Sequence, residues 1–552
     1  MTRRFKHARW LLAAACYAGF AGTSFAHDDP SEAASNPPGK FGRVSFPTSC
    51  TPAAQAQFDR ALAMLHSFFF PETVKAFEAI PQTDPGCAIA YWGLAVSQRP
   101  NPLVGPFDAA TLKRGLDAVE KGEAIGAKTQ RERDWLAAIK EFYKDYATID
   151  QDTRAKNYER AMEALVARYP DDLEAKIFYA LALNETYDHK DKNYAALLKA
   201  ARLLEEVEPK LPDHPGVTHY IIHSYDFAPI AQLGVGAADR YAQIAPDSPH
   251  AVHMPSHIYS QVGLWGKSIA ANERAIAVSR AYMARVKLDG LYGAIPHAWD
   301  FMEYAYLQLG RDDLAKAVMD ESNAVDKLYA PRPLSYTAPS AIPARYMLER
   351  QDWKGAAALQ PSPLVTKAAA ASPAALAITH FARAMGAARS GDAAAAQADI
   401  DKLLAIRSGL EKANQAYWAG QVEIQILAAQ GWLAQARDDK AQARQRLAAA
   451  ADLEDASEKH VTMEHRLYPA REQYADLLLM QGDSAEALKH YEASLASTPN
   501  RLRGWYGAAK AAQAGGDKGK AAAYFSKLAE LTRSAGTDRA EVREARMQVA
   551  SR

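Results

Sequence analysis

Residues 499–528 read PNRLRGWYGAAKAAQAGGDKGKAAAYFSKL, and this stretch decides the fold class. Apolar residues recur every three or four positions on both sides of Gly516, which is the pattern of two short helices joined by a tight turn. The positions that carry the pattern are Leu502, Trp505 and Ala509 before the turn, and Ala521, Phe525 and Leu528 after it. The stretch therefore predicts a helix–turn–helix unit that begins at the Pro499-Asn500 turn.

The same arrangement recurs along the chain. Further copies contain Gly482 with Ala487 and Tyr491, Gly391 with Ala396, Gly310 with Ala315, Gly263 with Trp265 and Ala275, and Tyr91-Trp92-Gly93. An aromatic residue in the first helix, a glycine turn, and alanine and an aromatic residue on the second helix resemble the tetratricopeptide repeat (TPR) family, whose period is 34 residues. The resemblance implies an all-α superhelical solenoid of antiparallel helix pairs.

Composition agrees with a helical solenoid and disfavours some functions. The 552 residues are rich in helix-forming Ala, Leu, Lys, Glu and Gln. Lys plus Arg and Asp plus Glu number 65 each, so the formal net charge is zero. Because a nucleic-acid-binding protein normally carries a concentrated basic face, we expect no nucleic-acid partner.

The first residues are typical of a secretion signal. Arg3, Arg4, Lys6 and Arg9 precede a largely apolar run, 10–25, that ends near a small-residue cleavage site at Ala26. The run is short for a membrane span, so we expect no membrane insertion after removal of a signal peptide, 1–26. A periplasmic or secreted location is the expectation.

Two cysteines remain after such processing, Cys50 and Cys87. In an oxidising compartment an isolated pair is more often a disulfide than a metal or catalytic site. We therefore predict a Cys50–Cys87 disulfide, which contributes ~3–4 kcal/mol in the chain-entropy description.

Proline distribution divides the chain. We expect a flexible leader at 27–50 and an N-terminal TPR-like array at 51–328. The proline-rich stretch 329–373 is predicted to be a joint that retains one degenerate helix pair around Trp353, because proline disrupts helix interiors. A C-terminal TPR-like array then occupies 374–552.

The histidines carry the most informative spacing. Seven of the fifteen lie within 214–297. His219 and His223 are four residues apart and so share a helix face. His253 and His257 repeat this pair 34 residues later, at equivalent places in the next repeat.

The resemblance also implies where the histidine pairs point. In TPR proteins the first helices line a concave groove, so two neighbouring helices would present two imidazoles each to one groove. The further residues expected to face this ligand groove are Asp226, His250, His297, Asp300 and Tyr304. Pro255 is expected to start the second helix late, which would place His250 and His253 in the preceding turn.

Three interpretations of the cluster stay open. His219, His223, His253 and His257 are suitable ligands for a transition metal, with zinc and copper as the candidate ions. Histidine, tyrosine and aspartate side chains also line sites for peptides or small organic molecules. A duplicated hydrogen-bond network without a ligand is the third interpretation.

Catalysis receives less support. Neither histidine pair encloses a glutamate, so the HExxH motif of zinc hydrolases is absent. A metal-dependent enzyme would need a nearby base, for which Glu303 is the candidate. We therefore predict a periplasmic binding protein whose groove takes a protein, peptide or small ligand, with transition-metal binding as the alternative.

Overall fold

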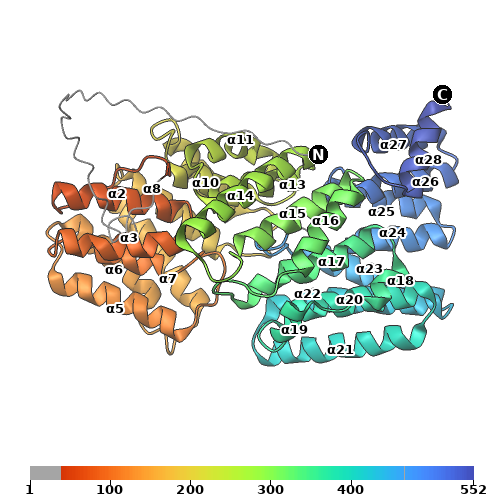
Figure 1. The fold of residues 1–552 in the computed structure, drawn as a ribbon, viewed down its shortest axis with the longest axis horizontal. Coiled ribbons are helices and arrows are strands. Elements are labelled where there is room, and N and C mark those ends of the chain that lie inside the picture. The colour runs from red at the N-terminus through yellow and green to blue at the C-terminus, as the bar shows by residue number, and fades with distance from the viewer. Residues whose placement is uncertain (1–38, 465, 552) are drawn as a thin grey trace, which may run out of the picture.

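The computed structural model describes residues 39–464 and 466–551. Within these ranges the chain forms α-helices, two short 3-10 helices and an isolated bridge between Leu291 and Leu328, and no β-strand. Figure 1 shows the helices stacked side by side along the long axis. The predicted all-α solenoid of antiparallel helix pairs is confirmed.

Each helix of the N-terminal array packs against the next along the chain. The helices of this array are α2 (Pro52–His66), α3 (Phe70–Thr83), α4 (Ile89–Ser97), α5 (Ala109–Ile125), α6 (Gln130–Tyr143), α7 (Gln151–Arg168), α8 (Leu173–Thr186), α9 (Ala195–Val207), α10 (Pro215–Tyr225), η1 (Ala231–Gly234), α11 (Val235–Ile244), α12 (Pro249–His253), α13 (Pro255–Gln261), α14 (Trp265–Val286), α15 (Ala294–Gln308) and α16 (Asp312–Asn323).

The rest of the chain continues the stack. The proline-rich stretch contains η2 (Pro333–Tyr336), α17 (Thr337–Glu349), α18 (Trp353–Ala358) and α19 (Pro363–Lys367). The C-terminal helices are α20 (Pro373–Ser390), α21 (Ala393–Lys412), α22 (Ala416–Ala436), α23 (Lys440–Ala456), α24 (Ala470–Met480), α25 (Ser484–Ser497), α26 (Leu502–Ala514), α27 (Lys518–Leu531) and α28 (Ala540–Ala550).

Small residues allow the close helix contacts that the repeat pattern requires. A Cβ atom at Gly507 of α26 would lie 2.1 Å from the ring of Tyr491 in α25, so only glycine fits there. Gly516 has φ +81° between α26 and α27, a conformation that glycine adopts without strain. These two glycines explain why the pattern at 499–528 forms a tight helix pair.

The described part of the expected flexible leader is packed instead. Residues 39–50 have no regular secondary structure, but Phe46 is fully buried. Its ring lies 5.4 Å from that of Trp92 and 5.1 Å from that of Trp135. Cys50 forms a disulfide with Cys87 next to α4. Burial of an aromatic side chain therefore holds this segment, and the predicted signal peptide, 1–26, lies outside the described residues.

The proline-rich stretch 329–373, predicted to be a joint between the two arrays, contains regular helices. Helix α17 contains Pro339 in its first turn, where the missing N–H costs no helical hydrogen bond, and Pro343 inside it. Ile342 packs into the core under α14–α16, whereas Leu348 packs into the core of the C-terminal helices. Helix α17 thus packs against the cores of both arrays.

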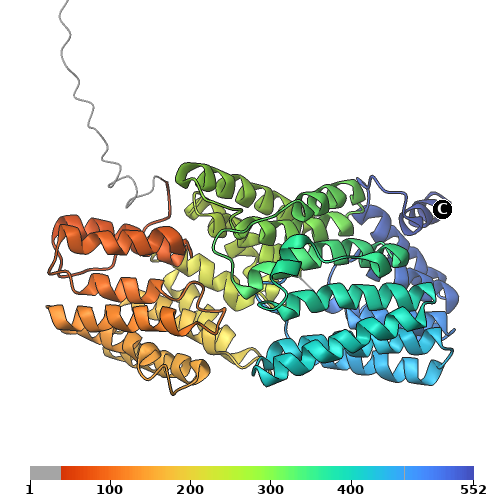
Figure 2. The ribbon, with the colours of Figure 1, turned by 60° about the horizontal axis from the view of Figure 1, so that its bottom comes forward.

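The C-terminal array also returns to contact the N-terminal array. Arg501 donates to the Tyr304 hydroxyl of α15 at 2.8 Å, and the Trp265 indole N–H donates to the Asn500 carbonyl at 2.8 Å. Figure 2 shows the green helices of the N-terminal array lying against the teal and blue C-terminal helices. Between α23 and α24, the 457–464 segment reaches the histidine-bearing helices, as described below.

No helix within the described ranges combines the length and the apolar character that crossing a lipid bilayer requires.

Candidate metal centre

Helix α10 places His219 and His223 on one face, as their spacing predicts. The helix begins after His214, whose Nδ1 accepts from the backbone N–H groups of Gly216 and Val217. The side chains of the His219–His223 pair are almost fully buried, at 0% and 5% exposure. They therefore lie inside the protein, between helices, rather than along an open groove.

The second pair lies at a helix break caused by Pro255. This proline separates α12 from α13, so it breaks the helix. The expected late start, with His250 and His253 in a preceding turn, is wrong, because both histidines lie in the short helix α12 before the break. His253 at the end of α12 still meets His257 in α13, with their Nε2 atoms 3.0 Å apart. His250, at the start of α12, turns instead toward His219, with the two Nε2 atoms 3.1 Å apart.

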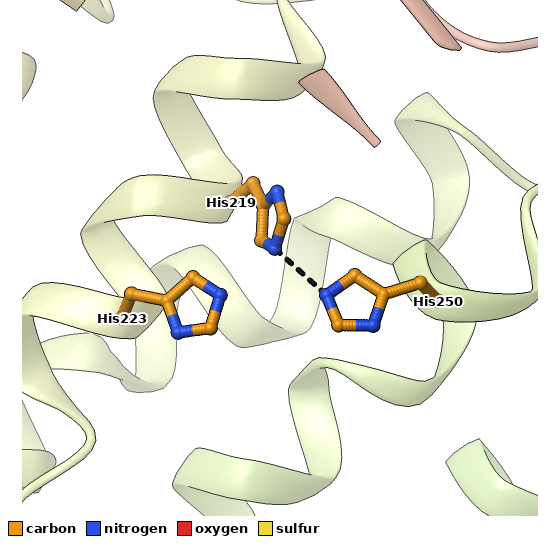
Figure 3. A group of neighbouring side chains, drawn as sticks. All are labelled: His219, His223 and His250. Carbon is orange, nitrogen blue, oxygen red and sulfur yellow. Dashed lines mark hydrogen bonds between the residues drawn. The ribbon is translucent and has the colours of Figure 1, made fainter. Parts of the chain in front are cut away.

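The histidines consequently form two groups of three. We call His219, His223 and His250 the first triad (Figure 3), and His253, His257 and His297 the second triad. Within each triad one nitrogen of every ring lies within 4.8 Å of the other two. The four histidines expected around one ion, His219, His223, His253 and His257, are thus divided between the two triads, which His250 and His297 complete.

Hydrogen bonds outside the triads determine which ring nitrogens face inward. The Nδ1 atom of His219 lies 2.6 Å from the His66 carbonyl oxygen, and that of His253 lies 2.6 Å from the Asn272 side-chain oxygen. Asn272 is held in this orientation because its amide nitrogen donates to the Ser268 carbonyl. Since oxygens of this kind only accept, each Nδ1 carries the proton and each Nε2 keeps its lone pair.

A carboxylate, that of Asp226, accepts the Nδ1 proton of His257 and leaves its Nε2 lone pair facing inward. Its Nδ1 lies 2.8 Å from Asp226 Oδ2. Asp226 also accepts from Gln261 at 3.1 Å and pairs with Lys459 of the 457–464 segment at 3.3 Å. A carboxylate behind a histidine is the usual outer partner of a metal-ligating imidazole.

Each triad has inward nitrogens to which no described residue offers a hydrogen-bonding partner of opposite character. His253 and His257 direct two lone pairs at each other across 3.0 Å, an arrangement that is repulsive without a cation between them. The buried Nε2 of His223 has no hydrogen-bond partner among the described residues. Burial is the main cause that lowers the pKa of all six triad histidines, that of His253 to about 4, so a neutral imidazole is the favoured form.

One phenylalanine packs on each triad. The ring of Phe68 lies 4.5–5.9 Å from the three rings of the first triad, and that of Phe301 lies 4.8–5.1 Å from the three rings of the second. Phe68 has φ 50°, a left-handed conformation that is costly for a bulky residue. Apolar rings of this kind restrict water around a metal site.

A third histidine group has a different character. His66 and His214 both bond to Glu174, at 3.1 and 2.8 Å, and the Tyr220 hydroxyl contacts the other nitrogen of His66 at 2.9 Å. Since His214 Nδ1 accepts backbone N–H groups, its Nε2 must donate to Glu174. All four ring nitrogens of this group, the Glu174 network, are satisfied, so it serves structure.

Three residues of α15 that were predicted to belong to the site, Asp300, Tyr304 and Glu303, are instead paired with arginines. Asp300 pairs with Arg345, and the Tyr304 hydroxyl accepts from Arg501 at 2.8 Å. The candidate base Glu303 is fully buried 3.7 Å from Arg345, and burial raises its pKa well above the usual value. The three side chains are directed toward these arginines, on the face of α15 that packs against α17 and α26.

Several residues that complete the centre were not predicted. His66, Phe68, Asn272 and Lys459 supply the outer acceptor, the apolar cover, the amide and the outer cation described above. Three of them lie more than 140 residues from the histidines they serve. No periodicity in the sequence links them to the triads.

Comparisons with known proteins show likeness in fold only. No protein-family model and no curated protein matches the chain. The solved human IFIT1 dimer with PPP-AAAA is similar at 13% sequence identity and a TM-score of 0.38, over 81% of this chain and 91% of that chain. Naa15/Naa10 bound to HypK-THB is similar at 13% identity and a TM-score of 0.25, over 90% and 92%. At these values the likenesses carry no argument about ligand or function.

Proposed function

We propose that this protein binds transition-metal ions, copper or zinc, at its two histidine triads, and that it does so in the periplasm or outside the cell. The observation that carries the proposal is the close contact between inward-facing lone pairs, most clearly at His253 and His257. A metal ion bonded to both nitrogens converts this repulsive contact into two favourable bonds.

The alternative of a purely structural network accounts less well for the same contacts. A network needs alternating donors and acceptors, as the Glu174 network has. In the triads, the outer Nδ1 protons of His219, His253 and His257 already donate to oxygens. In neutral form these three rings then have no proton left for their inward contacts, and the contact between His253 and His257 has no donor.

A protein or peptide partner, expected from the TPR resemblance, stays a prediction. Around the histidines the described residues leave little open surface, because four of the six triad side chains are buried and the 457–464 segment lies against them. A partner would have to bind another face of the solenoid. Catalysis also stays open, although Glu303 is paired with Arg345 and is no longer a candidate base at this centre.

The test is metal content. The full chain, as its host processes it, would be purified without a histidine tag and examined by elemental analysis after exposure to copper or zinc. We expect bound metal in the wild type and its loss in His223→Ala/His257→Ala, which removes one ligand from each triad. The matched control, His189→Ala/His490→Ala, changes two histidines outside the triads and should retain the metal. A wild type without metal after both challenges would refute the proposal.

A further inference from the structure

The two triads are close enough to act as one site. Across the gap between them, the rings of His223 and His257 have centroids 6.4 Å apart, and those of His250 and His253 are 6.3 Å apart. The longest separation inside the first triad, between His223 and His250, is also 6.3 Å. Neighbouring rings of different triads are therefore about as close as the most widely separated rings of the first triad.

We infer that the two triads hold a pair of copper ions, three imidazoles to each, and that the pair shares a small bridging ligand between them; this inference rests on the proposed metal-binding function. The triads are matched in composition, since each consists of three histidines under one phenylalanine. Three imidazoles leave a coordination position free on each ion, as an open site requires. The free positions face a common gap if both ions lie toward the neighbouring triad.

The charge around the site favours copper in its monovalent state. The six ligands are imidazoles, and the carboxylate that contacts one of them, Asp226, pairs with Lys459 at 3.3 Å, so the two charges offset each other. The cost of burying an ion rises with the square of its charge, so two divalent ions would be far more costly here than two monovalent ones. Among biological metals that accept imidazole, copper offers a monovalent state.

The same charge balance predicts the bridging ligand's chemistry when the copper is divalent. Two divalent ions in a neutral ligand shell leave excess positive charge, which a hydroxide, azide or similar small anion between them would offset. His250 and His297, one from each triad, are half-buried, whereas the other four histidines are buried. A small ligand would therefore approach at these two partly exposed histidines, and the phenylalanines packed on the triads would restrict larger molecules.

Copper stoichiometry tests the pair. Under anaerobic conditions, the full chain would be titrated with copper(I) against a chromophoric copper(I) chelator. We expect two ions per chain in the wild type, and one in His219→Ala/His223→Ala and in His253→Ala/His257→Ala. One ion in the wild type would overturn the paired site while leaving metal binding intact. Zinc that displaces copper(I) would overturn the choice of copper.

Magnetic coupling tests the shared ligand and needs no variant to fold. The wild type loaded with copper(II) should give an electron paramagnetic resonance signal of far fewer spins than its copper content, and azide should change that coupling. A single-triad variant should give one isolated spin per ion. Two uncoupled ions in the wild type would overturn the paired site, whereas absence of copper would overturn the proposed function as well.

Discussion

The triads and the Glu174 network are built from the same residue type, at a similar depth, a few ångströms apart in one core. In the network every imidazole nitrogen has a partner of opposite hydrogen-bonding character, and Glu174 accepts from both rings. In the triads the outer nitrogens of His219, His253 and His257 have such partners, but their inward nitrogens face another imidazole nitrogen. The difference teaches that the outer partners of a buried histidine, more than its burial, separate a structural role from a ligand-binding one.

The largest expected effect comes from breaking the network. In Glu174→Ala, two buried N–H donors lose their acceptor at roughly 1–3 kcal/mol each, so we expect about 4 kcal/mol less stability. Denaturant unfolding would measure this loss. Metal content per folded molecule should stay unchanged, and the exposed Glu163→Ala should have little effect. A Glu174→Ala protein that folds normally but loses metal would contradict the division between the two groups.

Metal should stabilise the protein only through the triads. With free copper or zinc at 100 times the dissociation constant, one site adds about 2.7 kcal/mol to the free energy of unfolding. We expect this gain in the wild type and not in His223→Ala/His257→Ala, measured by denaturant unfolding with metal and with chelator. Equal stabilisation of both proteins would place the metal elsewhere.

Asp226 should affect one triad and spare the other. In Asp226→Ala, His257 loses the carboxylate that orients it, and such outer changes typically weaken metal binding about 10–100-fold. We therefore expect weaker binding of one ion per chain in a competitive titration. Within the described residues, no imidazole of the first triad shares a hydrogen bond with the Asp226 carboxylate, so that triad is the internal control. A uniform loss at both positions would contradict the assignment.

The smallest expected effect is on how the free energy of unfolding depends on pH, which should differ between the first triad and the Glu174 network. In metal-free protein the folded pKa of His223 lies below its unfolded value of 6.5, so the unfolded state takes up the proton first and stability falls as pH drops below 6.5. Burial alone would raise the pKa of Glu174, but His214 and His66 outweigh it and lower that pKa below 4.5, so its contribution is lost only at lower pH. Each group changes the slope by about 1.4 kcal/mol per pH unit.

Unfolding measured across pH would resolve these windows. We expect His223→Asn to flatten the loss of stability just below pH 6.5, and Glu174→Gln to flatten it below pH 4.5. If both variants flattened the same window, the two groups would not be independent.

The periodic features of the chain were the predictable ones. The repeat at 499–528 is sufficient to predict a helix pair, because the residues that pack its two helices together lie within the same short stretch. These residues include Trp505, Gly516 and Phe525. The four-residue spacing of His219 and His223 likewise predicts their common face. Tertiary contacts overrode the local signals in residues 39–50, where an aromatic side chain outweighs a proline-rich composition that indicates a leader.

By itself, then, the sequence determined the helical solenoid and the gathering of the histidines, because helical spacing and repeat period are local properties. Only the tertiary structure decided how these histidines divide. The break at Pro255 turns His250 toward α10, and the stacking of α15 brings His297 to His253. It also decided which nitrogens stay unpaired, since the oxygens that bind the outer protons come from α2, α14 and the end of α10. Those contacts depend on how distant helices pack, which no local pattern encodes.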